Sequence, residues 1–135
     1  MSYPAMKEAG VDVRLGTDGS ASNNSLDLRA EAKAASLVQR HDHWDARVLG
    51  PEQTWDLATK GSQDWVTWDL SDIRMRPFGR DGRRLLSNLI YSGANVMDVF
   101  VEGEAVRRDG RTLTLDEDKV AGELEESVAD YYQDV

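Results

Sequence analysis

The stretch Val11–Asn24 reads Val-Asp-Val-Arg-Leu-Gly-Thr-Asp-Gly-Ser-Ala-Ser-Asn-Asn and carries the strongest fold signal in the 135-residue sequence. Its first five residues have the apolar content of a short buried strand, and a small polar loop follows at once. Gly16 and Gly19 flank Asp18, so the backbone can turn sharply there without a Cβ clash. Ligands in α/β folds gather at the carboxyl ends of parallel strands. We therefore predict that Asp18 lies at the mouth of a parallel sheet.

Two helices are expected after this loop. Asn24 or Ser25 can cap a helix that runs to about Arg40, and four apolar residues fall on one of its faces at helical spacing. These four residues are Leu28, Ala32, Ala35 and Val38. Pro51 suits the first turn of a second helix, which we expect over residues 52–59.

A small sheet is expected in the second half of the sequence. Alternating apolar and polar residues indicate a strand over 65–70, whereas residues 85–91 fit either a short helix or an extended segment. Two further strands, over 96–101 and 104–108, are separated only by Glu102-Gly103, which predicts a β-hairpin.

The last predicted element is a helix over residues 116–133. Thr114-Leu115-Asp116-Glu117 has the pattern of a capping box and marks its start. The apolar face of this helix consists of Val120, Leu124, Val128 and Tyr131.

The loop after the first predicted strand also resembles a known family. Residues 16–24 are similar to the G-T-D-G-x-x-S-N-N stretch of the chlorohydrolase and 5-methylthioadenosine/S-adenosylhomocysteine deaminase branch of the amidohydrolase superfamily. Residues 64–70 resemble the A-D-L-V-x-x-D-L strand of this branch, and residues 87–92 resemble its L-V-Y-x-A stretch. Residues 98–106 are similar to its V-x-x-V-x-V-D-G-x-x-V segment. The resemblance covers nearly the whole chain but corresponds to the C-terminal third of the family.

This resemblance implies an α/β fold, or an α+β fold if the elements have repacked. Residues 1–60 would supply the last β-α unit of a TIM-type barrel, and residues 61–135 a small β-sandwich remnant with the C-terminal helix, all packed as one compact unit. A complete (β/α)₈ barrel takes about 250 residues, and the family's first seven strands have no counterpart in this sequence. The connection from Thr59 to Asp64 is also shorter than in the family. We therefore expect a remnant or a rebuilt fragment of the parent fold.

The resemblance further implies a metal site. In the family, the aspartate that matches Asp18 binds a catalytic divalent metal, zinc or iron, and accepts a proton from the attacking water, whose pKa the metal lowers. Ser22, Asn23 and Asn24 would form a substrate loop, although residues of these types also cap helices. A catalytic zinc usually takes three protein ligands. Asp18 is thus expected to act only in an assembled site, and the chain alone is expected to hold no metal.

The only histidines of the sequence, His41 and His43, flank Asp42 and could bind nickel or zinc adventitiously. They fall at the predicted end of a helix, where the helix dipole favours a cationic side chain, and away from any strand mouth. We interpret them as helix-terminal residues and not as the H-x-H pair of the family.

Composition narrows the classes of partner. The sequence has 25 acidic and 16 basic residues and a net charge of −9, which disfavours nucleic-acid binding because phosphate contacts need a basic face. No apolar run approaches a membrane span and no signal-peptide pattern is found, so a cytoplasmic location without membrane contact is expected. The absence of cysteine excludes disulfides and thiolate metal sites. The carboxylate-rich composition resembles that of proteins from salt-loving microbes, with an ordinary acidic protein as the alternative.

Together these features predict the C-terminal fragment of a metal-dependent hydrolase that deaminates or dechlorinates an aminated heterocycle, inactive as an isolated chain. Two alternatives stay open. One is a non-catalytic module that self-associates as a homo-oligomer or binds a partner, because a fragment cut from a barrel exposes apolar faces, including one side of Val11–Leu15. The other is a complementing subunit whose partner carries the N-terminal barrel.

Overall fold

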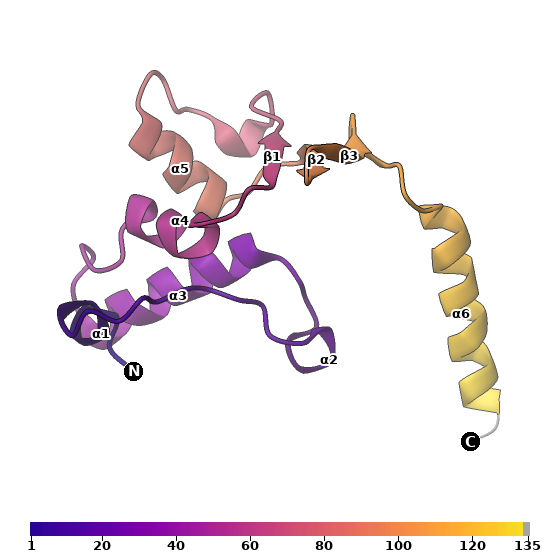
Figure 1. Cartoon of the computed structure of the whole chain (residues 1–135), viewed down its shortest axis with the longest axis horizontal. Coiled ribbons are helices and arrows are strands. Elements are labelled where there is room, and N and C mark those ends of the chain that lie inside the picture. The colour runs from indigo at the N-terminus through magenta and orange to yellow at the C-terminus, as the bar shows by residue number, and fades with distance from the viewer. Residues whose placement is uncertain (134–135) are drawn as a thin grey trace. The chain divides into compact units, whose positions relative to one another are not determined.

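The computed structural model describes residues 1–133 and combines helices with a small antiparallel sheet (Figure 1). The elements are, in chain order, α1 (Tyr3–Glu8), α2 (Ser20–Asn23), α3 (Leu28–His43), α4 (Pro51–Thr59), β1 (Trp65–Trp68), the 3₁₀ helix η1 (Ile73–Met75), α5 (Gly82–Tyr91), β2 (Val96–Val101), β3 (Glu104–Arg108), β4 (Arg111–Thr112) and α6 (Glu117–Gln133). Within residues 1–133, each helix is too short or too polar to span a membrane.

The chain forms two compact units rather than one. Unit 1 comprises residues 1–62 and 70–94, and unit 2 comprises residues 63–69 together with the chain from residue 95 onward. This division differs from the expected ranges 1–60 and 61–135, because η1 and α5 pack with the helices of unit 1.

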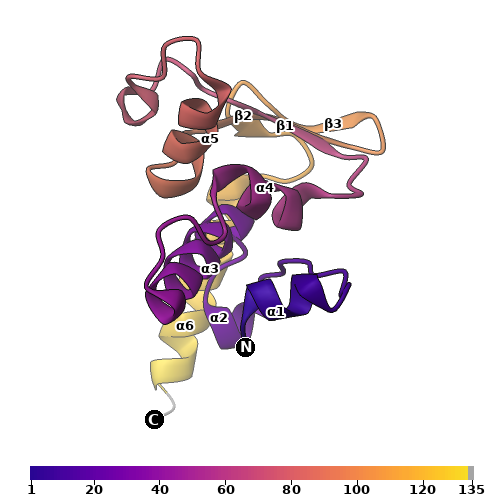
Figure 2. The same ribbon diagram turned by 90° about the vertical axis from the view of Figure 1, so that its left-hand side faces the viewer.

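Unit 1 is built on the helices α3, α4 and α5, which lie against one another (Figure 2). Its buried apolar side chains are those of Tyr3, Ala32, Leu49, Met75, Leu89 and Ile90. Helix α3 buries Ala32 and Ser36, whose small side chains allow the neighbouring helices to approach closely. The prediction also placed Val38 on the buried face; this was wrong, because Val38 is 62% exposed.

The strand predicted over Val11–Leu15 is not formed, so the barrel unit that it would begin lacks its strand. This segment is irregular, and Leu15 N donates a hydrogen bond to Leu57 O of α4 at 2.9 Å. A parallel strand needs a neighbouring strand to satisfy its backbone groups. Within the described residues the strands pair only with one another in unit 2, so residues 11–15 run as irregular backbone against the end of α4.

The first long helix begins later than predicted. Residues 20–23 form the separate short helix α2, and α3 starts at Leu28. Asp27 is its N-cap in place of Asn24 or Ser25, because the Asp27 carboxylate accepts hydrogen bonds from the backbone N–H groups of Arg29 and Ala30. Helix α4 covers the range predicted for the second helix, with Pro51 in its first turn.

The sheet of unit 2 confirms the predicted hairpin. Its strands lie in the order β1-β2-β3-β4, and every neighbouring pair is antiparallel. Glu102 and Gly103 between β2 and β3 both have positive φ, and so do Asp109 and Gly110 between β3 and β4. Positive φ at both central residues is typical of the two-residue turns that match strand twist. In the described part of the chain the strands form this one sheet, so the predicted β-sandwich is not present.

Two ambiguous or approximate predictions are resolved as helices. Residues 82–91 form α5, with Asp81 as its N-cap. Helix α6 begins one residue after the start of the predicted range 116–133, and its cap is Asp116, which accepts a hydrogen bond from Lys119 N, in place of Thr114 of the predicted capping box. The predicted apolar face of α6 is exposed along its length.

Candidate functional site

The segment that leads to the candidate loop is tied to the end of α4. Arg14 forms an ion pair with Asp12 at 3.0 Å, and its guanidinium also donates to the backbone carbonyl of Lys60. The Lys60 ammonium lies 3.2 Å from the second oxygen of Asp12. These two cations lower the pKa of the Asp12 carboxyl, Arg14 more than Lys60. Polar contacts therefore hold this segment where a sheet was expected to do so.

The loop from Gly16 to Asn24 presents Asp18 to solvent. Asp18 is exposed and has a φ of +57°, in the left-handed region that favours glycine and that aspartate and asparagine adopt more often than other residues. Gly19 follows as the N-cap of α2, and its carbonyl accepts hydrogen bonds from the Ser22 hydroxyl at 2.9 Å and from Asn23 N at 3.0 Å. The sequence prediction placed Asp18 at a strand end, which is not observed. Asp18 lies instead at the start of one tight helical turn.

Asn23 fastens this turn to helix α3. Its side-chain amide donates to Thr17 O at 3.0 Å and to the Glu31 carboxylate at 2.7 Å. The first bond fixes the carbonyl that precedes Asp18, and the backbone N–H of Asn23 donates to Gly19 O, which follows Asp18, at 3.0 Å. The second bond joins the turn to Glu31 on α3. Glu31 was not singled out in the sequence, where an acidic residue in the first helical turn looked like a response to the helix dipole. An asparagine eight residues before an acid gives no pattern from which this contact could have been found.

Ser22 and Asn24, the other two residues predicted to form a substrate loop, have local roles in the structure. The Ser22 hydroxyl is used within α2, and Asn24 ends α2 in a left-handed conformation, with a φ of +58°. The structure thus brings Asp18, Ser22, Asn23 and Asn24 together in one turn. Their predicted contacts with a substrate stay a prediction.

The donor set around Asp18 does not amount to a metal site. Among the described residues, no three side chains of His, Cys, Asp or Glu are grouped so that they could hold a metal ion. His41 and His43 lie in the last turn of α3, as predicted, and His43 Nε2 is 3.0 Å from the Ser2 hydroxyl. A single carboxylate falls short of the three protein ligands of a catalytic zinc. The residues present therefore do not fit a catalytic metal.

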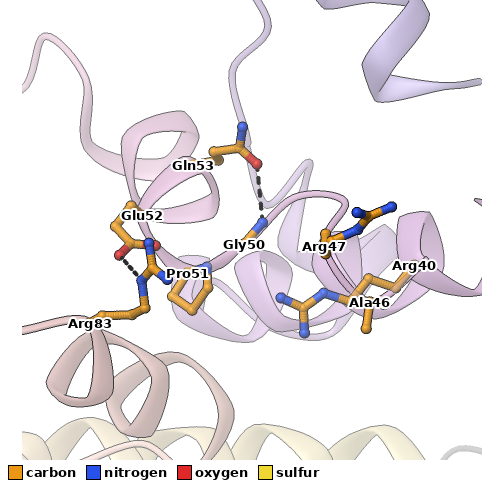
Figure 3. A pocket seen from close by; sticks show the side chains of 8 residues that line it. All are labelled: Arg40, Ala46, Arg47, Gly50, Pro51, Glu52, Gln53 and Arg83. Carbon is orange, nitrogen blue, oxygen red and sulfur yellow. Dashed lines mark hydrogen bonds and ion pairs between the residues drawn. The ribbon is translucent and has the colours of Figure 1, made fainter.

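A separate cavity of about 560 Å³ lies in unit 1 at the start of α4 (Figure 3). Its lining consists of Arg40, Ala46, Arg47, Gly50, Pro51, Glu52, Gln53 and Arg83. Arg83 Nε donates to the Glu52 carboxylate at 2.7 Å and thereby lowers the pKa of that carboxyl. Gly50 N donates to the side-chain oxygen of Gln53 at 3.2 Å. None of the residues predicted to form the site lines this cavity.

The chain is similar to one named group of deaminases, although its described residues include no complete set of metal ligands. No family model matches the chain. A 5-methylthioadenosine/S-adenosylhomocysteine deaminase from Bacillus thuringiensis (strain Al Hakam) is 36% identical, over 86% of this chain and 30% of that protein. The deaminase of the same name from Bacillus cytotoxicus is 35% identical over the same shares.

A solved structure gives the same assignment at the level of the fold. An adenosine deaminase from Xanthomonas campestris, crystallised with bound zinc, superposes with a TM-score of 0.82 at 26% identity, over 97% of this chain and 33% of that chain. The chain is therefore homologous to about a third of a deaminase with the amidohydrolase fold. Within that class the relatives are 5-methylthioadenosine/S-adenosylhomocysteine deaminases, which confirms the resemblance seen in residues 16–24. The matched portion is consistent with the C-terminal part of these proteins.

Proposed function

We propose that this chain is the aspartate-bearing C-terminal portion of a metal-dependent hydrolytic deaminase, and that the 135 residues alone do not turn over substrate. The observation that carries the proposal is the Asp18 turn. An exposed carboxylate in a left-handed conformation lies between Thr17 and Gly19, whose carbonyls accept hydrogen bonds from the side-chain amide and the backbone N–H of Asn23, in a segment that matches the deaminase motif. Backbone strain at an exposed residue is a pointer to function, because it persists only where the surroundings enforce it.

The chemistry available to Asp18 is that of one ligand and one proton acceptor. In a site completed by residues outside this chain, Asp18 would help to hold a divalent metal, which would activate water, and its carboxylate would accept a proton. The zinc of the Xanthomonas campestris deaminase supports such a metal in the parent family. The remaining ligands would have to come from residues outside this chain. We therefore propose a complementing partner that carries an N-terminal barrel.

The proposed substrate is an aminated heterocycle of the adenosine type. This rests on the printed names of the relatives, which act on 5-methylthioadenosine, S-adenosylhomocysteine or adenosine. Removal of a ring halogen is the second reaction proposed, because the motif in residues 16–24 is shared with the chlorohydrolases of the same branch. A cytoplasmic location is part of the proposal and agrees with a cysteine-free sequence.

Ammonia release from 5-methylthioadenosine, S-adenosylhomocysteine and adenosine tests the proposal directly. The purified chain should show no turnover with or without added zinc. When it is co-expressed with a relative's barrel truncated before its matching third, zinc-dependent deamination should return. Asp18→Ala should abolish the restored activity, whereas Asp56→Ala, which removes an exposed carboxylate on α4, should leave it intact.

Two outcomes would contradict this proposal. Turnover by the chain alone that is lost in Asp18→Ala would show that it assembles a site by itself. Restored activity that survives Asp18→Ala would show that this carboxylate has no part in the reaction.

A non-catalytic interaction module is the second candidate function. It is favoured by apolar side chains that the structure leaves exposed in unit 1, including Val11 at 53%, Val38 at 62% and Trp44 at 89%. This candidate needs these side chains to belong to one contiguous patch, since a contiguous apolar patch marks a surface that a partner covers. A complex with the truncated barrel that forms but lacks activity in the ammonia assay would support this candidate over the enzyme fragment.

A further inference from the structure

Helix α6 carries an apolar stripe that nothing in the described chain covers. Val120, Leu124, Val128 and Tyr131 follow one another at helical spacing, and their exposures range from 47% to 68%. Most helical stability in proteins comes from packing of the apolar face, and this 17-residue helix packs its stripe against no described residue. We therefore expect another surface to cover this apolar stripe.

The surroundings of the stripe specify the charge of that occupant. Glu123 and Glu125 flank Leu124 on its two sides, because successive helical residues are about 100° apart around the axis. In the sequence of α6 there are six acidic residues, Glu117, Asp118, Glu123, Glu125, Glu126 and Asp130, against one basic residue, Lys119, which forms an exposed ion pair with Glu123 at 3.7 Å. Two α6 helices packed on each other would bring these carboxylates together, which is unfavourable. The stripe thus fits a surface that is apolar with cationic groups beside it.

The two units differ in net charge, and the more basic unit 1 offers the cationic groups that a contact with α6 needs. Unit 1 has 12 basic and 11 acidic residues, for a net charge of +1, and unit 2 has 4 basic and 14 acidic residues, for a net charge of −10. The acidity of the whole chain is therefore a property of unit 2 alone. A cationic surface for α6 has to be sought on unit 1.

The segment Ile73–Arg84 of unit 1, called here the arginine segment, has the required chemistry. It contains five arginines and one acid, Asp81. Arg74 pairs with Asp72 and Arg83 with Glu52. The other three, Arg76, Arg80 and Arg84, are exposed and pair with no acidic side chain of the described residues. The apolar side chain of Ile73 is 81% exposed in the same segment.

We propose that α6 of one molecule docks on the arginine segment of a second copy of this chain. The apolar stripe of α6 covers Ile73, and Glu123 and Glu125 lie among the unpaired arginines. The contact joins two different surfaces, so it is heterologous and propagates from copy to copy unless the assembly closes into a ring. Because the complementarity is ionic, salt weakens the association.

Sedimentation velocity of the full chain over a concentration series tests the contact. Association should be present at about 50 mM salt, where screening is weak, and its dissociation constant should rise at least about tenfold at about 500 mM salt. A chain that stays monomeric throughout the series would overturn the proposal. Association that strengthens with salt would also overturn it, since that sign belongs to pairing of two acidic α6 helices.

Charge exchange identifies the two surfaces. Glu123→Lys with Glu125→Lys should abolish association, and so should Arg80→Glu with Arg84→Glu. An equimolar mixture of the two double variants should associate again, because each reversed surface then meets its complement. A mixture that stays monomeric would contradict the pairing. Because the arginine changes lie on exposed side chains of unit 1, they keep the test decisive if the α6 variant loses its helix by circular dichroism.

A matched control separates this contact from a general effect of charge. Glu102→Lys with Glu104→Lys makes the same change in net charge on unit 2 as the α6 variant, at the exposed turn between β2 and β3. It should associate like the unaltered chain. If it lost association to the same extent as the α6 variant, net charge alone would account for the effect and the docking surface would be refuted.

Discussion

Two residues of unit 1, Leu49 and Asp18, share a left-handed backbone and little else. The φ of Leu49 is +50° and that of Asp18 is +57°. Leu49 is 2% exposed, and its carbonyl accepts hydrogen bonds from Ser36 Oγ at 2.9 Å and Thr54 Oγ1 at 3.0 Å. Asp18 is exposed. The same backbone conformation is therefore buried and enclosed at one position and open to solvent at the other.

The difference shows how strain can be assigned a role. At Leu49 the side chain fills the core and the carbonyl satisfies two buried hydroxyls, so packing more than offsets the cost of the conformation. At Asp18 no comparable burial exists, and the conformation is imposed from outside through Asn23. Strain with a structural return marks a folding residue. Exposed left-handed residues elsewhere end a helix, as Asn24 does, or form a hairpin turn, as Glu102 does, whereas Asp18 precedes α2 in the segment that matches the deaminase motif.

Replacement of Leu49 should have the largest effect on stability. Leu49→Ala removes a buried side chain and should lower the free energy of unfolding of unit 1 by about 2–5 kcal/mol. Leu49→Gly loses the same side chain but relieves the left-handed strain, so it should be less destabilising than Leu49→Ala by about 1 kcal/mol, against the usual order of these residues. Urea denaturation followed by circular dichroism measures both values.

The matched control for this pair is Leu37→Ala. Leu37 lies on α3 and is 49% exposed, so its truncation should change stability by about 0.5 kcal/mol or less. Two outcomes would contradict the role given to Leu49. One is an equal loss of stability in Leu37→Ala and Leu49→Ala, and the other is a lower stability of Leu49→Gly than of Leu49→Ala.

The Asp18 turn should respond in the opposite way. Asp18→Gly loses no buried contact and relieves the left-handed strain, so the free energy of unfolding should stay the same or rise by up to about 1 kcal/mol. Asn23→Ala removes two hydrogen bonds, one of them to a carboxylate, and should cost about 1–2 kcal/mol. The same urea titration compares them. If Asp18→Gly cost as much as Asn23→Ala, Asp18 would have a structural role and its interpretation as a functional residue would fail.

Local rules account for the parts of the fold that the sequence predicts correctly. The two-residue turns at Glu102-Gly103 and Asp109-Gly110, Pro51 at the start of α4 and the apolar periodicity of α6 each act within a few residues. Such features keep their meaning wherever the segment is placed. These features predicted the β2–β3 hairpin and the bounds of α4 and α6 to within one residue.

The predictions that failed depend on partners that a sequence does not display. Val11–Leu15 has the composition of a strand, but a strand forms only beside another strand, and none is available in unit 1. The burial of Ser36 in place of Val38 depends on which face of α3 meets α4 and α5. The contact between Asn23 and Glu31 follows from the same packing. The motif in residues 16–24 identified the family because it is a local signature, yet it could not show what holds Asp18.

The smallest effect is expected near another left-handed residue, Asp109. Asp109 is exposed like Asp18, but its backbone is held by a hydrogen bond as that of Leu49 is. Its φ is +49°, it is exposed, and its backbone N–H donates to the Asp98 carboxylate at 3.0 Å. Hydrogen bonds from the Thr67 hydroxyl and then from Asp109 N lower the pKa of Asp98. A lowered pKa stabilises the folded state above the ordinary value of about 4, and this contribution is lost as pH falls through the folded value.

Nuclear magnetic resonance titration of the Asp98 carboxyl should therefore give a pKa below the ordinary value of an aspartate. Thr67→Val removes the larger cause of the shift and should move this pKa upward, while Glu104→Gln on the same sheet should leave it in place. Asp98→Asn should flatten the acid side of the stability profile of unit 2 below about pH 4. If Asp98 kept its lowered pKa in Thr67→Val, the Asp109 N–H would be the main support, and the turn would resemble Leu49, enclosed by its partners. If the pKa returned to its ordinary value, the Thr67 hydroxyl would account for the shift and the Asp109 N–H would add little to it, so Asp109 would owe its conformation to the β3–β4 turn alone.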